Sequence, residues 1–260
     1  MDMELTYIYH SGFALSGDGF TVIMDYYRDS EDGQAQADLN RLMDGTFSNQ
    51  EAGMPEGTVH SELLRRPGKL YVLASHFHPD HFNKEVLQWR EQRPDIIYIF
   101  SKDILRHRRA QKEDAVWLKK GEEYKDETLS VRAFGSTDVG VSFLLQASGK
   151  KIFHAGDLNN WHWMDESTEA QWKGAEKNFL HDLYAYTPEV DVAMFPVDPR
   201  LGKEYMRGAG QFVTKIKTHI FVPMHFTPEY AKANAFRDFA EAHGVRFVSL
   251  THRGQKIEIE

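Results

Sequence analysis

The sequence predicts an α/β protein made of two β-sheets packed together, with helices on their outer faces. The first half of the chain is rich in short apolar runs typical of strands, and the second half alternates such runs with helical segments. Of the 260 residues, 41% are hydrophobic and 13% are aromatic, which is enough for a sizeable core. This length favours one large domain, here residues 1–260, with one insertion.

Strands are expected where apolar residues alternate or run on between turn-forming residues. One hairpin is expected around Ser16-Gly17-Asp18-Gly19 and another around Ser148-Gly149. The expected strands span residues 4–10, 13–15, 20–24, 69–75, 96–100, 115–118, 129–134, 141–146, 151–154, 190–195, 219–222, 246–250 and 255–259.

Helices are expected where apolar positions recur at helical spacing between breaking residues. Pro94 ends the first of them and Gly244 stops the last. The expected helices span residues 84–93, 102–110, 166–185, 204–217 and 230–243.

Residues 28–66 interrupt this pattern with a polar, glycine-containing stretch in which only residues 37–43 look weakly helical. About forty residues without clear periodicity are long for a plain loop. The stretch could be a lid over a site or a partner-binding insertion, and a solvated excursion explains it equally well.

Composition excludes several classes of function. A net charge of −8 disfavours broad nucleic-acid binding, and no apolar run is long enough to span a membrane. The acidic start, Met1–Glu4, leads straight into a strand and is not a signal peptide, so we expect a cytoplasmic protein. Cysteine is absent, so any metal must be held by histidines and carboxylates.

Four potential metal ligands lie in the six residues His-Phe-His-Pro-Asp-His at positions 76–81. They follow the apolar run 69–75, so a buried strand would carry them to the edge of a sheet. In extended backbone His76 and His78 point to the same side, and the proline then turns the chain towards the last two ligands. Packing explains the cluster poorly, because buried imidazoles without a metal would need several other partners.

Later strands also end in residues of the metal-ligand type. The strand 151–154 leads to Asp157, the strand 219–222 leads to His225, and the strand 129–134 leads into a loop that contains Asp138. Neighbouring strands that end at one edge can bring such groups together.

These motifs, in this order along nearly the whole chain, resemble the metallo-β-lactamase superfamily. The six-residue motif is highly specific for that superfamily, and the early strands that end at Asp25 fit its start. The resemblance implies a four-layer αββα sandwich with a two-metal site at one edge. It does not define the substrate, because this fold carries many hydrolytic and some redox chemistries.

The resemblance also implies roles for the ligands. His76 and His78 would hold the first metal, Asp80, His81 and His225 the second, and Asp157 would bridge them. The metals would share a hydroxide and polarise a carbonyl or phosphoryl oxygen of the substrate. Such ligands suit one or two zinc ions, with manganese or iron as alternatives.

The first metal lacks its usual third histidine, because the loop at 135–140 contains none. Asp138 is the best substitute, and a loop-supporting hydrogen bond is an equal alternative for it. Without a substitute, the catalytic site would hold a single metal, bound by Asp80, His81, Asp157 and His225. His78 itself favours hydrolysis, because diiron flavoprotein relatives typically carry Glu at this position.

Several neighbours are candidates for supporting or catalytic roles. Asp25 is expected to support the metal loop by hydrogen bonds, with turn capping as the alternative, and His10 could reach the pocket or be structural. Trp161 could form a wall for the substrate and His162 could donate a proton, beside Asp80 as the other catalytic candidate, although packing also explains the aromatic residues.

Arg200 follows the strand 190–195 and could bind an anionic group of the substrate. The alternative is an ion pair between Arg200 and Asp198 within their loop. His154 lies on the opposite strand face from Asp157 and is discounted as a ligand.

The leading hypothesis is a zinc-dependent hydrolase of a small-molecule ester, lactone or phosphorylated substrate. The single-domain plan resembles the lactonase-like branch of the superfamily. A phosphodiesterase of the same fold and a metal-binding protein without turnover are the alternatives. β-Lactamase activity itself is not expected, because no export signal is present. The expected partner is a small, anionic substrate, with no nucleic acid and no membrane.

Overall fold

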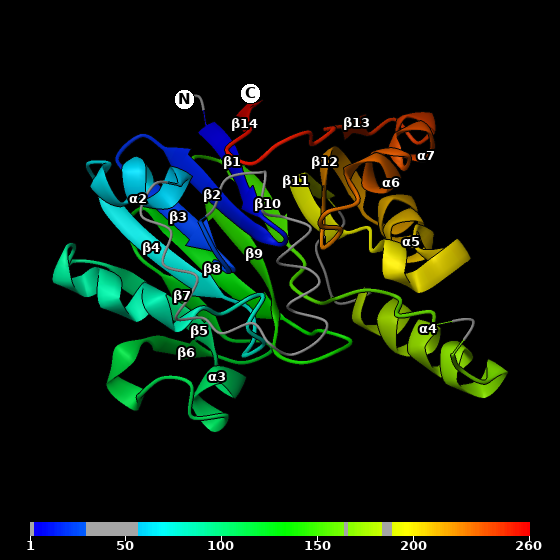
Figure 1. The fold of residues 1–260 in the computed structure, drawn as a ribbon, viewed down its shortest axis with the longest axis horizontal. Helices are drawn as coiled ribbons and strands as arrows, with labels where there is room; N and C mark the ends of the chain where they lie inside the picture. Colours follow the sequence, from blue (N-terminus) through cyan, green and yellow to red (C-terminus); the bar gives the residue numbers. More distant parts are fainter. Residues whose placement is uncertain (1–2, 30–56, 164–165, 184–188) are drawn as a thin grey trace. The chain divides into compact units, whose positions relative to one another are not determined.

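The computed structural model describes residues 3–29, 57–163, 166–183 and 189–260 (Figure 1). The chain divides into two compact units, which we call the first unit (Met1–Leu118 with Thr251–Glu260) and the second unit (Lys119–Leu250). Each unit is built on one seven-stranded sheet. The weak helix expected at 37–43 lies outside the described residues.

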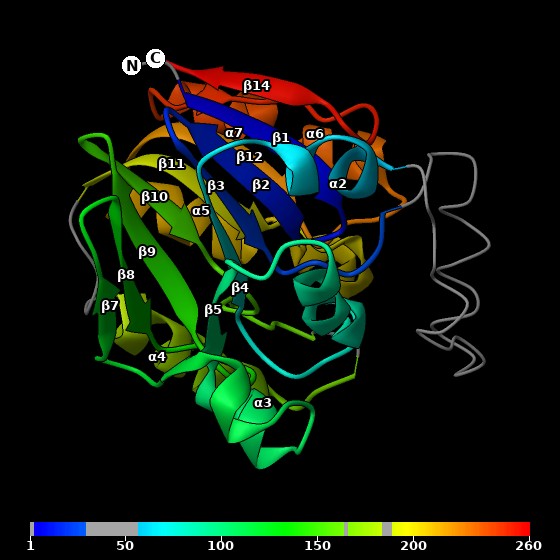
Figure 2. The ribbon, with the colours of Figure 1, turned by 90° about the vertical axis from the view of Figure 1, so that its left-hand side faces the viewer.

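The sheet of the first unit has the strand order β14-β1-β2-β3-β4-β5-β6, which Figure 2 shows from one side. Its strands are β1 (Met3–Tyr9), β2 (Gly12–Gly17), β3 (Phe20–Met24), β4 (Lys69–Ala74), β5 (Ile97–Ser101), β6 (Val116–Leu118) and β14 (Lys256–Ile259). The pairs from β14 to β3 are antiparallel, and those from β3 to β6 are parallel. The carboxyl ends of β3 and β4 therefore share one edge, where Asp25 and the motif at 76–81 follow.

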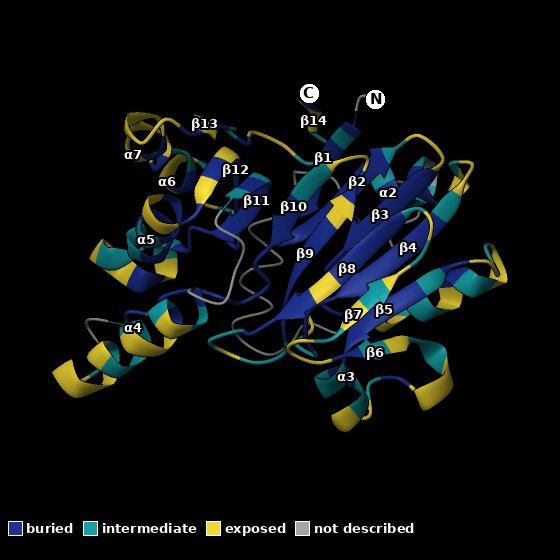
Figure 3. Ribbon diagram, turned by 180° about the vertical axis from the view of Figure 1, so that it is seen from behind, coloured by how far each residue is buried: buried dark blue, intermediate teal, exposed yellow. Residues whose placement is uncertain are grey.

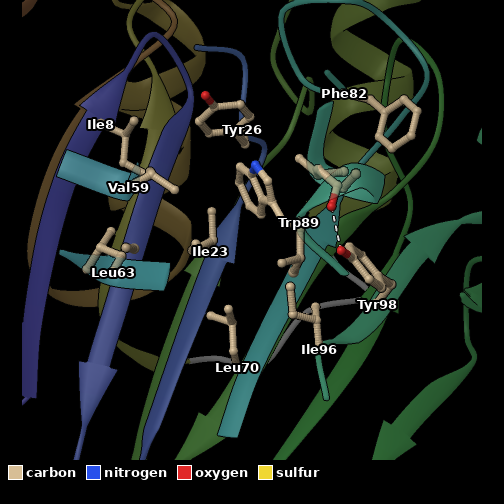
Figure 4. Close-up of a cluster of buried hydrophobic side chains, with 14 of the residues drawn as sticks. Ile8, Ile23, Tyr26, Val59, Leu63, Leu70, Phe82, Trp89, Ile96 and Tyr98 are labelled. Carbon is tan, nitrogen blue, oxygen red and sulfur yellow. Dashed lines mark hydrogen bonds between the residues drawn. The ribbon is translucent and has the colours of Figure 1, made fainter. Parts of the chain in front are cut away.

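Short helices accompany this sheet, and most of them bury apolar residues in its core. They are α2 (Thr58–Ser61), the 3₁₀ helices η3 (Leu63–Arg65), η4 (Lys84–Glu91) and η5 (Lys112–Asp114), and α3 (Lys102–Arg106). Figure 4 shows Val59, Leu63 and Trp89 packed against strand residues such as Ile23 and Leu70. Val59, Leu63 and Leu64, which the sequence places in the polar insertion, are thus part of the core of the first unit.

The sheet of the second unit has the order β13-β12-β11-β10-β9-β8-β7. Its strands are β7 (Glu123–Lys125), β8 (Leu129–Phe134), β9 (Ser142–Ala147), β10 (Lys150–His154), β11 (Glu189–Pro196), β12 (Lys217–Met224) and β13 (Arg246–Phe247). β10, β11, β12 and β13 pair in parallel, so the loops with Asp157, Asp198 and His225 leave the same edge. The edge strand β7 was not predicted, because Glu-Tyr-Lys has no apolar alternation and pairs only through β8.

The helices of the second unit are α4 (Glu169–Leu183), the 3₁₀ helix η6 (Pro199–Glu204), α5 (Arg207–Lys215), α6 (Tyr230–Asn234) and α7 (Arg237–Ala242). The helix expected at 230–243 is thus divided into α6 and α7. Phe212 of α5 stacks against Phe153 and Phe195 of the sheet. Figure 3 shows that the strands are mostly buried and that exposed positions concentrate on the helices. No described helix is long and apolar enough to cross a membrane.

Candidate metal centre

The motif at 76–81 folds as a tight turn directly after β4. The backbone N–H groups of His81 and Phe82 both donate to the carbonyl of His78, at 3.0 and 2.9 Å. The turn brings Nε2 of His76 to within 3.0 Å of Nδ1 of His78. The carboxylate of Asp103 accepts a hydrogen bond from the N–H of Phe77 at 3.0 Å, which ties the turn to α3. Two imidazole nitrogens are therefore held together at the edge of the first sheet.

The buried carboxylate of Asp25 orients the imidazole of His81. This fully buried carboxylate lies 2.7 Å from Nδ1 of His81 and accepts hydrogen bonds from the N–H of Ser75 at 2.7 Å and its hydroxyl at 2.6 Å. A carboxylate only accepts hydrogen bonds, so Nδ1 of His81 carries the proton and Nε2 carries the lone pair that a metal needs. This carboxylate–histidine arrangement is typical of metal sites.

His10 and Asp80 lie beside His81. Oδ2 of Asp80 is 3.4 Å from Nε2 of His10 and 3.8 Å from Nε2 of His81. The ligand-type atoms of these three residues all lie within 4.8 Å of one another, close enough to be held by one ion. His10, which the sequence suggests only as a neighbour of the pocket, is therefore placed at ligand distance from Asp80.

The second unit carries a matching pair of ligand-type residues. Oδ1 of Asp157, after β10, lies 3.3 Å from Nε2 of His225, after β12. The other nitrogen of His225, Nδ1, lies 3.0 Å from Oδ2 of the buried Asp198. Asp198 thus orients His225 as Asp25 orients His81. Sequence reasoning missed this contact, although Asp198 follows β11 just as the ligands follow their strands.

Asp198 is held as an anion. Burial favours its neutral form, but hydrogen bonds from His225 and Arg200 keep the pKa of Asp198 well below its usual value. The guanidinium of Arg200 grips both carboxylate oxygens, with Nε 3.0 Å from each and Nη2 2.6 Å from Oδ2. The ion pair that the sequence offers as the alternative for Arg200 is therefore present, while the Arg200 side chain is still 45% exposed.

The loop after Asp157 contains Trp161 and His162, which the sequence offers as a wall residue and a proton donor. The indole N–H of Trp161 donates to the carbonyl of Asp157 at 3.0 Å, and its ring meets that of His225 edge-on at 5.7 Å. Trp161 therefore lies beside both Asp157 and His225. His162 is only 2% exposed and packs against Trp172, with ring centres 4.7 Å apart.

Asp138 lies on an exposed loop, where its N–H lies 3.4 Å from the hydroxyl of Ser136. The contact with the ligand loop is made instead by Thr137, whose hydroxyl donates to the carbonyl of Asn159 and accepts from its N–H at 3.0 Å. The buried His154 accepts a hydrogen bond from the N–H of Gly156 at 3.2 Å and so supports the turn that presents Asp157.

Backbone strain is concentrated at these strand ends. Among the described residues, five non-glycine residues have positive φ, and three of them are His10 (57°), Asp25 (46°) and His225 (62°). Each costs about 1–2 kcal/mol in the left-handed region, and such strain typically persists at functional sites. The histidine and carboxylate donors at these strand ends suit zinc, manganese or iron. The donors and the backbone strain together indicate that these strand ends are candidate metal-binding loops.

Comparisons with known proteins agree with this geometry. A family model described as the beta-lactamase superfamily domain matches residues 4–225. No curated protein matches the sequence significantly.

Similar solved structures include Igni18, a metallo hydrolase from Ignicoccus hospitalis, with 18% identity, coverage of 100% of this chain and 99% of that chain, and a TM-score of 0.61. They also include YhfI from Bacillus subtilis, a metallo-beta-lactamase fold protein, with 12% identity, 99% coverage of both chains and a TM-score of 0.59. CmlA from Streptomyces venezuelae, a diiron beta-hydroxylase, has 15% identity and a TM-score of 0.60, and the match covers 98% of this chain and 54% of that chain.

At these identities the structural likeness concerns the fold, which is shared by a hydrolase and a diiron hydroxylase. The fold and family expected from the sequence are both confirmed. The chain belongs to the beta-lactamase superfamily, and its two seven-stranded sheets with their helices match the metallo-β-lactamase fold.

Proposed function

We propose that this protein is a metal-dependent hydrolase that acts on a small-molecule ester, lactone or phosphorylated substrate. The observation that carries the proposal is the pair of buried carboxylates that fix histidines. Asp25 holds Nδ1 of His81 at 2.7 Å, and Asp198 holds Nδ1 of His225 at 3.0 Å. In each pair Nε2 is the nitrogen left with the lone pair, as metal ligation requires.

The proposed ligands follow the family motif. They are His76, His78, Asp80 and His81 of the first unit and Asp157 and His225 of the second, with Asp138 as a further candidate. The donor set suits one or two zinc ions. A bound divalent ion would polarise the scissile carbonyl or phosphoryl group and lower the pKa of a coordinated water.

The remaining residues would bind and orient the substrate. Trp161 offers an aromatic wall beside His225. Arg200 keeps an exposed guanidinium edge that could meet an anionic group, with its charge partly balanced by Asp198. Asp80 and His162 stay our candidates for proton handling, and the burial of His162 restricts that role to protons passed within the protein.

Iron is the main competitor of zinc, because the diiron hydroxylase CmlA has the same fold. The presence of His78 favours hydrolysis, and a phosphodiesterase is the second hydrolytic candidate. Protein purified without added metal and measured by elemental analysis distinguishes these metals. Rates on ester, lactone and phosphodiester panels then distinguish the substrate classes.

We expect one or two equivalents of zinc, and loss of most of it in His76→Ala and His81→Ala. His219→Ala is the matched control, because this histidine of β12 is 49% exposed and pairs with Glu189 of β11. Chelation should lower hydrolysis by about a thousandfold, and zinc should restore it. Iron with oxygen-dependent turnover, or a protein that binds no transition metal, would contradict the proposal.

A further inference from the structure

A cavity of about 550 Å³ lies on the second unit, framed by α4, η6, α5 and the chain around α7. Its volume is in the range of small-molecule sites. All of the residues that form it belong to the second unit, and the proposed metal ligands are not among them. They are Leu180, Lys203, Glu204, Met206, Arg207, Gly210, Gln211, Thr214, Lys215, Phe236 and Phe239.

One wall of the cavity is aromatic. The rings of Phe236 and Phe239 stack with centres 5.5 Å apart and planes 23° apart. Phe239 is 41% exposed and is one of only two exposed large hydrophobic residues among the described residues, the other being Val116. Gly210 of α5 faces it, and a Cβ there would lie 3.3 Å from the Phe239 ring. Glycine thus lets the α5 backbone and the aromatic wall approach closely.

The cavity side of α5 is more exposed than the side that packs on the sheet, because Gln211 is half-buried and Thr214 is exposed. Ala209, Phe212 and Val213 form the buried side of the helix, and Phe212 stacks on the sheet. Gly210, Gln211 and Thr214 recur at helical spacing on the other side and line the cavity. An apolar wall in a concave surface that the fold does not itself fill is a feature of binding sites.

The charge of the cavity is positive, although the whole chain carries −8. Three lining residues are basic and one is acidic. Arg207 is neutralised by Glu204 at 3.0 Å and by Glu176 at 3.0 Å. Lys203 forms no ion pair with any residue that the structure describes, so its ammonium group is available to an anion.

The polar wall is already organised. Gln211 accepts a hydrogen bond from the amide of Asn160 at 2.8 Å and donates to Glu176, which also holds Arg207. These groups satisfy one another, so they do not need to be paired by a ligand. The uncommitted features of the cavity are the exposed ring of Phe239 and the Lys203 ammonium.

We propose that this cavity binds an amphipathic anion, a molecule with an apolar ring or alkyl chain and a single anionic group. The apolar part would lie against the exposed ring of Phe239, which Phe236 supports from the core, and the anionic group would meet Lys203. The proposal does not depend on the proposed hydrolysis, because the cavity is formed without the candidate ligands.

The test is a fluorescence titration of the full chain with 1-anilinonaphthalene-8-sulfonate, whose aromatic rings and sulfonate match this class. Monomeric octanoate and octan-1-ol are then used as competitors. We expect one equivalent of probe to bind, and octanoate to displace it at least about tenfold more effectively than octan-1-ol. Equal competition by the alcohol would overturn the anionic part of the proposal, and binding that never saturates would overturn the site.

Two variants locate the binding. Phe239→Ala removes an exposed side chain, and Lys203→Glu reverses the unpaired charge, so neither should disturb the core. Each should raise the dissociation constant of the probe at least about fivefold. The matched control is Val116→Ala, because Val116 is also 41% exposed but lies in the first unit. Binding that is unchanged in both cavity variants, with thermal unfolding confirming their fold, would overturn the proposal.

Discussion

Each of the two units contains a buried aspartate that orients a histidine, but the other partners of the two aspartates differ. In each, a buried aspartate at the end of one parallel strand fixes a histidine that follows the neighbouring strand, Asp25 with His81 and Asp198 with His225. Asp25 is completed by the backbone and hydroxyl donors of Ser75, whereas Asp198 is completed by the backbone N–H of Arg200 and by its partly exposed guanidinium. One carboxylate is thus locked into the fold, and the other is balanced by a cation that water can reach.

From this difference we expect the two aspartates to contribute unequally to the stability of the fold, although both orient a histidine. A buried carboxylate whose partners are neutral groups of the core cannot be removed without leaving those groups unsatisfied. A carboxylate paired with an exposed arginine can be lost while the arginine is rehydrated.

The strongest test of the comparison is Asp25→Ala against Asp198→Ala. Both should weaken metal affinity about 10–100-fold, because each frees the imidazole it orients. Asp25→Ala should also cost about 3 kcal/mol of unfolding free energy, because Ser75 loses both acceptors in the core. Asp198→Ala should cost about 1–2 kcal/mol, because Arg200 can turn to solvent.

Chelator competition measures the affinity, and urea denaturation of the metal-free proteins measures the stability. Ser75→Ala serves as the control, because it removes the hydroxyl donor and keeps the carboxylate and the N–H donor. Equal losses of stability in the two aspartate variants would break the comparison.

The first unit should also have a pH dependence that originates at His60. Hydrogen bonds to Asp29 and then to Glu85 raise the pKa of His60 from 6.5 to about 9, against the opposing effect of burial. A histidine whose folded pKa is raised stabilises the protein fully below its unfolded pKa and loses that contribution as pH rises through its folded pKa. Stability should therefore fall by about 2–3 kcal/mol between pH 6.5 and pH 9.

Denaturant unfolding of the metal-free protein across this range measures the effect. His60→Gln should flatten the profile and lower stability mainly at the acid end. The second unit offers an internal reference, because the exposed Glu189–Lys217 pair should contribute little. An unchanged slope in His60→Gln would show that another group carries the dependence.

The smallest effect on stability is expected for Asp138→Ala. Asp138 is exposed on its loop, so its removal should change the unfolding free energy by less than about 0.5 kcal/mol. If Asp138 completes the first metal site, the variant should lose one metal equivalent in elemental analysis. Full retention of metal would rule out the ligand role and leave Asp138 as a loop residue.

Much of the fold could be predicted, because its signals are local. β4 is a short apolar run that leads directly to the motif at 76–81, and the strands before Asp157 and His225 have the same form. The predictions failed where neighbours decide the structure. β7 pairs through an adjacent strand despite its polar sequence, and Val59, Leu63 and Leu64 join the core despite their polar surroundings.

The sequence by itself therefore determined the family, the two-sheet composition and the residue types available as ligands. These features were predictable because strand periodicity and the six-residue motif are both properties of consecutive residues. Only the tertiary structure decided which nitrogen each histidine offers. That choice belongs to Asp25 and Asp198, which lie 56 and 27 positions away from their histidines. It also brought His10 to Asp80 and opened the cavity beside Phe239, because such contacts depend on strand pairing and helix packing rather than on local pattern.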